Sequence, residues 1–281
     1  MKIKLVFDST IVYTQKEAKQ NNIEITPFTI DDNGTVYRDN VDITPKKFYE
    51  LQKNNKFIKT SLPNVLETTN LFKTLLKDYD HIIYLTLPEK LSGTYAAGKM
   101  IAKELDETRI SVVDINTGVG MARVLAEVGN KMIEEGRSIE EIIDHLKKAY
   151  KFSRLFVIPL NMETLKVGGR VSNLAVSIFS MIKLKICLYL TLSGSVDKFE
   201  IARTEAKIMQ RVIEKVKKDL GTEDLLIYLI YTDDKSLLNP ARKVLENTFP
   251  EAEFQEMVFA PTIGAHSGPG TIAFHFCKKH W

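Results

Sequence analysis

The sequence predicts a two-lobed α/β protein, with an N-terminal three-layer, Rossmann-like parallel sheet followed by a C-terminal α/β domain with a mixed sheet. Short β-branched apolar runs alternate with helical patterns in the first half, which is typical of parallel sheets covered on both faces. A Ser193-Gly194 turn joins two strand-like runs in the second half and indicates an antiparallel pair. The 281 residues exceed one usual domain, and we place the junction near residue 150, giving domains 1–150 and 151–281.

The first half contains four predicted strands, each short and rich in β-branched residues. They cover residues 3–7, 25–30, 81–85 and 110–113. Helical patterns cover residues 14–21, 45–54, 63–77, 94–106 and 121–135. The turn sequence Asp31-Asp32-Asn33-Gly34 predicts a small hairpin beside the main sheet.

The second half begins after a helix that spans residues 138–152, where Ser138 and Glu141 form a capping box. Strands are predicted at 155–158, 184–191, 225–231, 253–259 and 271–276, with a further strand ending near Ala202. Helices are predicted at 160–166, 172–182, 204–219 and 236–247, and a glycine-rich loop precedes the last strand. Segment 174–182 is apolar almost all round, so Phe179 and Met181 either line a cavity or belong to an ordinary core.

Bulk composition excludes several classes of protein. The net charge, 39 basic minus 36 acidic residues or +3, does not favour a nucleic-acid partner. Lys183 and Lys185 interrupt the longest apolar stretch, so no transmembrane segment is expected, and the start of the chain does not resemble a signal peptide. Cys187 and Cys277 lack a CxxC spacing and are interpreted as buried free thiols of a cytoplasmic protein.

Candidate binding residues follow the predicted strands, because ligands of open α/β sheets bind beyond the carboxyl ends of the strands. The candidates are Asp8-Ser9-Thr10, Thr60-Ser61, Ser92-Gly93-Thr94, Asp114 and the stretch His266-Ser267-Gly268-Pro269-Gly270. They offer hydroxyls and backbone N–H groups but few cations. A helix N-terminus at Ser92 and Gly93 favours an anion, and uncharged donors suit a carboxylate better than a phosphate.

Structural interpretations of the same residues remain open. Ser92 and Thr60-Ser61 can be helix N-caps, and Asp8 and Asp114 can cap neighbouring helices. Gly268-Pro269-Gly270 is typical of a tight turn that needs positive φ, and a single histidine such as His266 is often structural. In the alternating Phe274-His275-Phe276, the histidine is interpreted as an outward-facing strand residue.

Taken together, the motifs resemble the DegV family of fatty-acid-binding proteins. The resemblance covers nearly the whole chain and rests on segments in family order: Asp8-Ser9-Thr10, Thr60-Ser61-x-Pro63, Leu91-Ser92-Gly93-Thr94-Tyr95, Leu165-Lys166-x-Gly168-Gly169-Arg170, Arg203-Thr204 and His266-Ser267-Gly268-Pro269-Gly270. The chain departs from the family pattern at Ile11-Val12, Leu87-Pro88 and Ile115, which leaves the roles of Asp8 and Asp114 undefined.

The resemblance implies a long-chain fatty acid whose carboxylate binds at Thr60 and Ser92, with Ser61 and Gly93 beside them and His266 nearby. It implies an apolar tunnel between the two lobes and a non-catalytic carrier that needs no metal or cofactor. It also implies a dihydroxyacetone-kinase-like partner that phosphorylates the carboxyl group for phospholipid synthesis, with Arg170 and Arg203 on the partner-facing surface.

Two other functions remain alternatives. The first is a serine hydrolase with Ser92 as nucleophile and His266 as base, although the sequence around Ser92 lacks the first glycine of GxSxG. The second is a sugar or nucleotide-phosphate module, for which strongly basic phosphate ligands are missing from these loops. The sequence defines neither acyl length nor oligomeric state.

Overall fold

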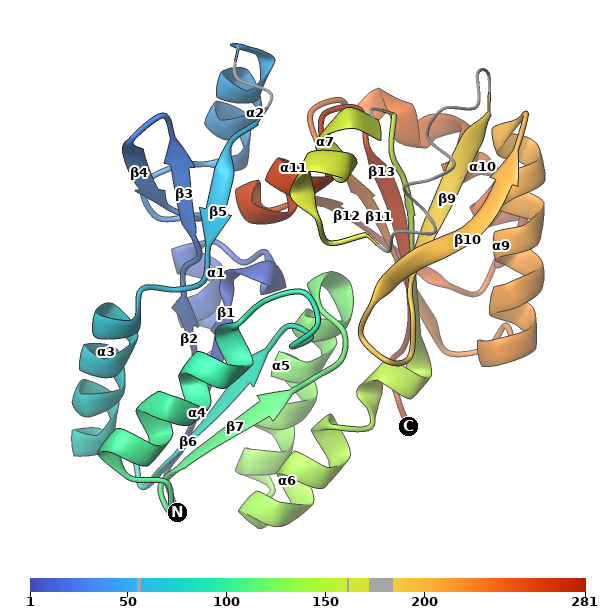
Figure 1. Ribbon diagram of the computed structural model, residues 1–281. Helices are drawn as coiled ribbons and strands as arrows, with labels where there is room; N and C mark the ends of the chain where they lie inside the picture. The colour runs from blue at the N-terminus through green and yellow to red at the C-terminus, as the bar shows by residue number, and fades with distance from the viewer. Residues whose placement is uncertain (55–56, 161, 172–183) are drawn as a thin grey trace. The chain divides into compact units, whose positions relative to one another are not determined.

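The computed structural model describes residues 1–54, 57–160, 162–171 and 184–281 (Figure 1). Their contacts divide the chain into two compact units. Unit 1 contains Met1–Thr44 and Ile58–Tyr150, and unit 2 contains Pro45–Phe57 and Lys151–Trp281. The second unit therefore includes one helix that the chain contributes from within the first half.

Unit 1 is built on a four-stranded parallel sheet with the order β2-β1-β6-β7. Its strands are β1 (Ile3–Asp8), β2 (Ile23–Thr26), β6 (His81–Thr86) and β7 (Ile110–Asp114). From β1 the chain moves first to one side, to β2, and then returns to the other side, to β6 and β7. The strand order thus reverses between β1 and β6, where α/β sheets bind ligands beyond their carboxyl ends.

Helices cover both faces of this sheet and confirm the predicted three layers. On one face, α3 (Val65–Asp78) and α4 (Thr94–Leu105) pack against the side chains of Val6, Tyr84 and Val112. On the other, α5 (Val119–Glu134) approaches β1 so closely that a Cβ at Gly129 would lie 2.8 Å from Leu5. The remaining helices are α1 (Gln15–Gln20), capped by Thr14, and α6 (Ile139–Leu146), which has the predicted Ser138–Glu141 capping box.

A small antiparallel sheet in unit 1 carries part of the candidate site. It has the order β4-β3-β5, with β3 (Thr29–Asp32), β4 (Thr35–Arg38) and β5 (Lys59–Ser61). The predicted hairpin turn is confirmed, because Asn33 and Gly34 have φ of 52° and 93°. The single strand expected at 25–30 is wrong, since β2 and β3 belong to different sheets and are separated by Pro27, which has no N–H to donate.

Unit 2 contains a mixed six-stranded sheet with the order β10-β9-β8-β13-β11-β12, as the fold class predicted. Its strands are β8 (Ser153–Ile158), β9 (Lys185–Leu190), β10 (Val196–Ala202), β11 (Leu225–Tyr231), β12 (Glu253–Val258) and β13 (Ile272–Lys278). The β11–β12 pair is parallel, and the other neighbours are antiparallel, including the predicted β9–β10 hairpin.

Different helices cover the two faces of this sheet. The helices α9 (Glu205–Leu220) and α10 (Asn239–Thr248) pack on the face formed by Phe156, Phe274 and Phe276. On the opposite face, α7 (Met162–Gly168) contacts Val157 through Leu165. Beside α7 lies α11 (Pro261–Ser267), which in turn contacts α2 (Pro45–Asn54).

Part of the expected glycine-rich loop before the last strand is instead helical. Pro261 stands at the start of α11, where its missing N–H costs no hydrogen bond, and the helix ends before Gly268. Gly268 and Gly270 then have φ of 80° and 73°, as the predicted tight turn requires. The predicted helix 172–182, with Phe179 and Met181, lies outside the described residues.

Two buried side-chain types complete the core of unit 2. Cys187 and Cys277 are buried free thiols, as expected. His275, predicted to face outward, is fully buried on β13. The prediction is wrong because an alternating pattern indicates a solvated face only when one face of the sheet is open to water, and here α9 and α10 cover one face and α7 packs on the other.

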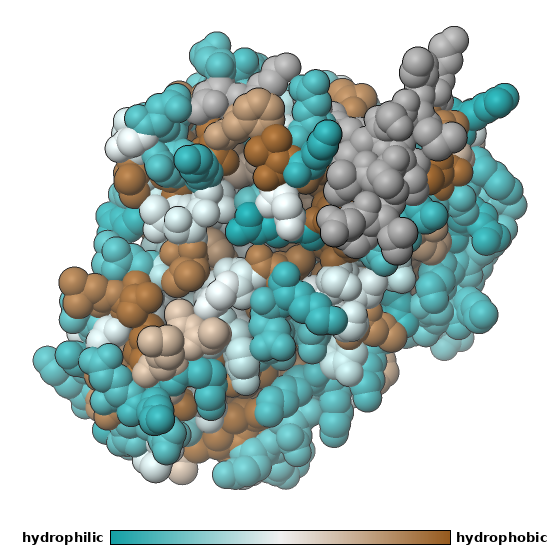
Figure 2. Space-filling model, viewed as in Figure 1, coloured by the Kyte–Doolittle hydropathy of each residue, from teal (hydrophilic) through white to brown (hydrophobic). Residues whose placement is uncertain are grey.

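On the face shown in Figure 2, hydrophilic residues surround several spots of apolar residues. Exposed apolar residues of unit 1 include Val36, Leu66 and Met100. Single exposed hydrophobic residues are common in globular proteins and do not define an interface. No helix among the described residues is both long enough and apolar enough to cross a membrane.

Candidate functional site

Loop 87–93 presents Ser92 at the reversal point of the parallel sheet. This loop connects the carboxyl end of β6 to α4, whose N-cap is Gly93. The Ser92 hydroxyl shares a 2.8 Å hydrogen bond with the Thr94 hydroxyl and accepts the Thr94 N–H at 3.3 Å. Ser92 is half-buried and Gly93 is exposed, so the positive end of the helix dipole has uncharged donors at its tip.

Two carboxylates contact the same loop. The Asp8 carboxylate accepts the Leu87 N–H at 2.6 Å, and the Asp114 carboxylate accepts the Glu89 N–H at 3.0 Å. Burial raises the pKa of Asp8, and hydrogen bonds from Thr10 and Leu87 counteract part of that rise. Asp8 also caps the short 3₁₀ helix η1 (Ser9–Ile11) by accepting the Thr10 N–H at 3.0 Å, so one of the open interpretations of Asp8 is confirmed.

Thr60 and Ser61 lie on β5 rather than at a helix cap. The N-cap of α3 is Asn64, whose side chain accepts the Glu67 N–H at 3.1 Å. Thr60 pairs with Ile30 of β3 and is half-buried, whereas Ser61 is exposed. The N-cap interpretation of Thr60-Ser61 is therefore wrong, and the two hydroxyls stand on a strand of the small sheet.

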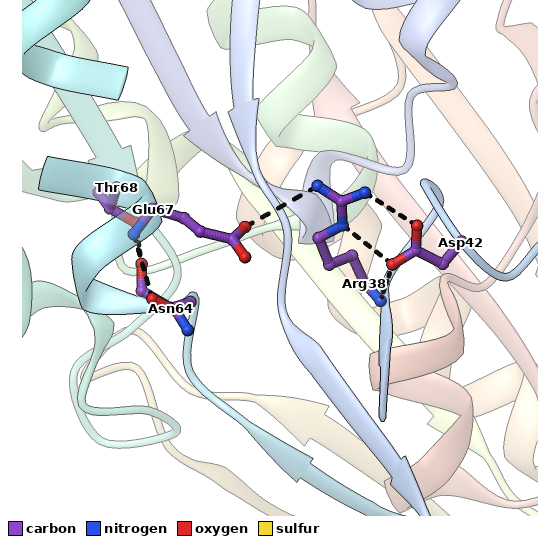
Figure 3. Close-up of polar contacts among 5 residues, drawn as sticks. All are labelled: Arg38, Asp42, Asn64, Glu67 and Thr68. Atoms are coloured by element: carbon purple, nitrogen blue, oxygen red, sulfur yellow. Dashed lines mark hydrogen bonds and ion pairs between the residues drawn. The ribbon is translucent and has the colours of Figure 1, made fainter. Parts of the chain in front are cut away.

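The start of α3 is tied to the small sheet (Figure 3). Arg38 of β4 makes a bidentate contact with Asp42, at 2.9 Å for each bond, and lies 4.0 Å from Glu67 of α3. The Thr68 hydroxyl donates to the Asn64 carbonyl at 2.9 Å. The Arg38–Glu67 pair is exposed and therefore links α3 to the small sheet only weakly.

Leu62 connects this strand to loop 87–93. A Cβ at Gly93 would lie 3.4 Å from a methyl group of Leu62, which is ordinary van der Waals contact. Leu62 is two residues beyond Thr60, and Gly93 follows Ser92. The structure thus brings the Thr60-Ser61 segment and the Ser92-Gly93 segment to one region of unit 1.

His266 lies in unit 2, on the last turn of α11. A Cβ at Gly168 would lie 2.9 Å from His266 Nδ1, so the Gly168-Gly169-Arg170 motif packs against the histidine motif. Burial, with a further contribution from the charge of Arg170, lowers the pKa of His266 to about 4. The imidazole is therefore neutral near pH 7 and can act as a hydrogen-bond donor or acceptor without carrying charge.

The two arginines of the predicted partner-facing surface are both exposed but stand apart. Arg170 donates to the Gly168 carbonyl at 2.8 Å and precedes Val171, which bridges to Val196 at the start of β10. Arg203 follows the far end of the same strand. At about 3.3 Å per residue, the two backbone positions are separated by on the order of 20 Å along β10.

Sequence reasoning missed two residues of α2 that hold α11. The Tyr49 hydroxyl donates to the Phe259 carbonyl at 3.0 Å, and the Gln52 amide donates to the Gly264 carbonyl at 3.0 Å. Both side chains are buried. Their helical spacing with buried Phe48 was the available signal, but it did not indicate which partner they contact.

An apolar cavity of about 490 Å³ lies between α9 and α10 of unit 2. Its lining includes Met209, Ile213 and Val244. The cavity is on the sheet face opposite α7, so it does not belong to the His266 region. The residues that the structure describes contain no cluster of three or more His, Cys, Asp or Glu side chains suited to a metal ion.

These features define a two-unit α/β protein with uncharged donors at the carboxyl end of a parallel sheet, an arrangement suited to an anion. A family model described as "Uncharacterised protein, DegV family" matches residues 2–279. The chain belongs to the DegV family, which confirms the resemblance of its motifs.

Curated and solved relatives match along nearly their whole lengths. A DegV domain-containing protein from Clostridium acetobutylicum is 29% identical over 276 residues, covering 96% of this chain and 97% of the relative. A fatty-acid-binding DegV family protein from Thermus thermophilus is 26% identical, with a TM-score of 0.88 and coverage of 99% and 100%. The Bacillus subtilis DegV, a fatty acid binding protein, is 27% identical, with a TM-score of 0.87 and 99% coverage of each chain.

Proposed function

We propose that this protein binds one long-chain fatty acid, whose carboxylate is held by Thr60 and Ser92 with Ser61, Gly93 and His266 close by. The observation that carries the proposal is the N-terminus of α4, where Ser92 and Gly93 stand beside Leu62 at the reversal point of the sheet. Two solved family members with 26% and 27% identity bind fatty acids, which supports the same ligand class here.

The ligand's two ends make different contributions to binding. Each buried CH₂ contributes about 0.8 kcal/mol, so the acyl chain supplies most of the affinity. We place this chain in an apolar tunnel between the two lobes. The carboxylate loses its hydrating water on entry, and this loss must be compensated by hydrogen bonds from the protein. Hydroxyls and a helix N-terminus provide such bonds without attracting phosphates.

The proposal includes a carrier role without catalysis. The protein would present its fatty acid to a dihydroxyacetone-kinase-like fatty acid kinase, which phosphorylates the carboxyl group for phospholipid synthesis. Arg170 and Arg203 are exposed cations and would face that partner. No cofactor is required for this role.

The serine hydrolase alternative gains no support from the surroundings of Ser92. Its hydroxyl bonds to the hydroxyl and N–H of Thr94, neither of which is a general base. The loop also lacks the glycine that precedes the serine in a nucleophile elbow.

Retention of fatty acid by head-group variants tests the proposal. We expect Ser92→Ala and Thr60→Ala to retain roughly tenfold less palmitate than the parent, the scale of one lost hydrogen bond to a charged group. Retention is measured by mass spectrometry after gel filtration. Arg203→Ala is the control, because it alters an exposed cation outside the head-group loops and should retain palmitate fully. Equal retention by all four proteins would contradict the proposal.

A further inference from the structure

Asp8 and Asp114 stand on either side of the strand that leads into loop 87–93. The sheet order places β6 between β1 and β7, with Phe7 opposite Leu85 and Thr86 opposite Asp114. Asp8 ends β1 and Asp114 ends β7, so the two carboxylates flank the carboxyl end of β6.

Hydrogen bonds connect these carboxylates to Ser92 through a short stretch of backbone. Asp8 accepts from the Leu87 N–H at 2.6 Å and Asp114 from the Glu89 N–H at 3.0 Å, on either side of Pro88. The Pro88 carbonyl then accepts the N–H groups of Leu91 and Ser92 at 2.9 and 3.3 Å. The two N–H groups that the carboxylates accept therefore belong to the same turn that positions Ser92.

The second oxygen of each carboxylate is also bound, which fixes the orientation of the side chain. Asp8 Oδ1 accepts the Thr10 N–H at 3.0 Å and also contacts the Thr10 hydroxyl. Asp114 Oδ1 accepts the Asn116 N–H at 2.8 Å. Direct contact with an anionic ligand would be repulsive, so these groups can serve an anion site only through the donors that they hold in place.

We propose that Asp8 and Asp114 are positioning residues for the ligand's carboxylate, because they hold loop 87–93 so that Ser92 and the N-terminus of α4 face it. This inference rests on the proposed function. Charge-assisted bonds to backbone N–H groups are among the stronger protein hydrogen bonds, and misplacing a contacting group by about 1 Å strongly weakens its interaction. The carboxylates supply no contact themselves and act through Ser92.

The test compares palmitate with methyl palmitate, which has the same acyl chain but an uncharged ester head group with one added methyl group. Asp8→Asn and Asp114→Asn each replace one of the two acceptor oxygens with an amide nitrogen, so the side chain loses its charge and can no longer accept both backbone N–H groups. We expect each variant to bind palmitate about tenfold more weakly, on the scale of one hydrogen bond to a charged group, while affinity for methyl palmitate stays unchanged. Affinities are measured by displacement of a fluorescent acyl probe.

Asp106→Asn is the matched control. Asp106 Oδ1 accepts the Thr108 N–H at 3.0 Å, which is the same kind of bond, but Asp106 lies between α4 and the start of β7, at the amino ends of the strands. This variant should bind both ligands like the parent. A similar loss of palmitate binding in Asp106→Asn would show a general effect on folding and would overturn the inference.

A double-mutant cycle with Ser92→Ala tests the route of the effect. If Asp114 acts through Ser92, adding Asp114→Asn to Ser92→Ala lowers palmitate affinity no further, because coupled residues are not additive. Additive losses, or equal losses for palmitate and methyl palmitate, would overturn the inference. A parent protein that binds neither ligand would instead refute the proposed function itself.

Discussion

At the scale of single residues, the proposed site places hydroxyls against the ligand and keeps two carboxyl groups behind the loop that carries Ser92. Hydroxyls of Thr60 and Ser92 are the proposed contacts, whereas Asp8 and Asp114 accept the Leu87 and Glu89 N–H groups of the supporting loop. The hydroxyls could be predicted because they follow predicted strands in the sequence. The roles of the two carboxylates could not, because they depend on β6 lying between β1 and β7.

The buried position of His275 predicts that the folded protein becomes less stable as the pH falls. It is fully buried, and neither ring nitrogen has a hydrogen-bond partner among the described residues. Burial lowers its pKa from 6.5 to about 3. The folded protein therefore binds fewer protons at this site than the unfolded chain over the interval between those two pKa values.

We expect the stability that depends on neutral His275 to be fully present above about pH 6.5 and to be lost as the pH falls towards 3. The unfolding free energy should fall by up to about 1.4 kcal/mol per pH unit in this range. In His275→Phe the unfolding free energy should fall less steeply, by about 1.4 kcal/mol per pH unit, because one fewer proton is taken up on unfolding. Urea unfolding at several pH values measures this slope. Parallel pH dependences of parent and variant would contradict the assignment.

At the scale of elements, α2 and α11 form a tightly fitted pair within unit 2. Tyr49 of α2 lies against Gly264 of α11, and a Cβ there would be 2.8 Å from the ring atom Cζ. The Tyr49 hydroxyl also donates to the carbonyl of Phe259, just before α11, and the Gln52 amide donates to the carbonyl of Gly264 within it. Gly264 is thus required by close approach rather than by positive φ.

Gly264→Ala is expected to destabilise the protein by about 1–3 kcal/mol, because the added methyl group overpacks the contact with Tyr49. Thermal or urea unfolding measures the change. Tyr49→Ala removes the obstructing ring, so Gly264→Ala should cost much less in that background. An equal cost in both backgrounds would show that Tyr49 does not limit the space at Gly264.

Elements with strong local signals were predicted from the sequence. The strand β11 has the predicted bounds, and the capping box at Ser138 fixes the start of α6. The helix α11 was not predicted because Gly264 within it and the glycines after it indicate a turn, yet Gly264 is needed for the contact with Tyr49. Tertiary packing therefore makes this segment helical although its local sequence favours a turn.

At the scale of the whole molecule, the chain passes between its two units at residues 44–45, 57–58 and 150–151. The donors Thr60 and Ser92 belong to unit 1, and His266 belongs to unit 2. Thr60 is only two residues from the start of its segment of unit 1 at Ile58. The place of α2 in unit 2 was not visible in the sequence, because α2 is separated from α11 by more than half of the chain.

Native mass spectrometry of the purified protein tests the central claim most directly. We predict a complex that carries one long-chain fatty acid per chain, released as a free acid by organic solvent and strongly reduced in the Thr60→Ala/Ser92→Ala double variant. A protein that carries no lipid after incubation with palmitate, or that binds an uncharged lipid equally well, would contradict a site built to hold a carboxylate.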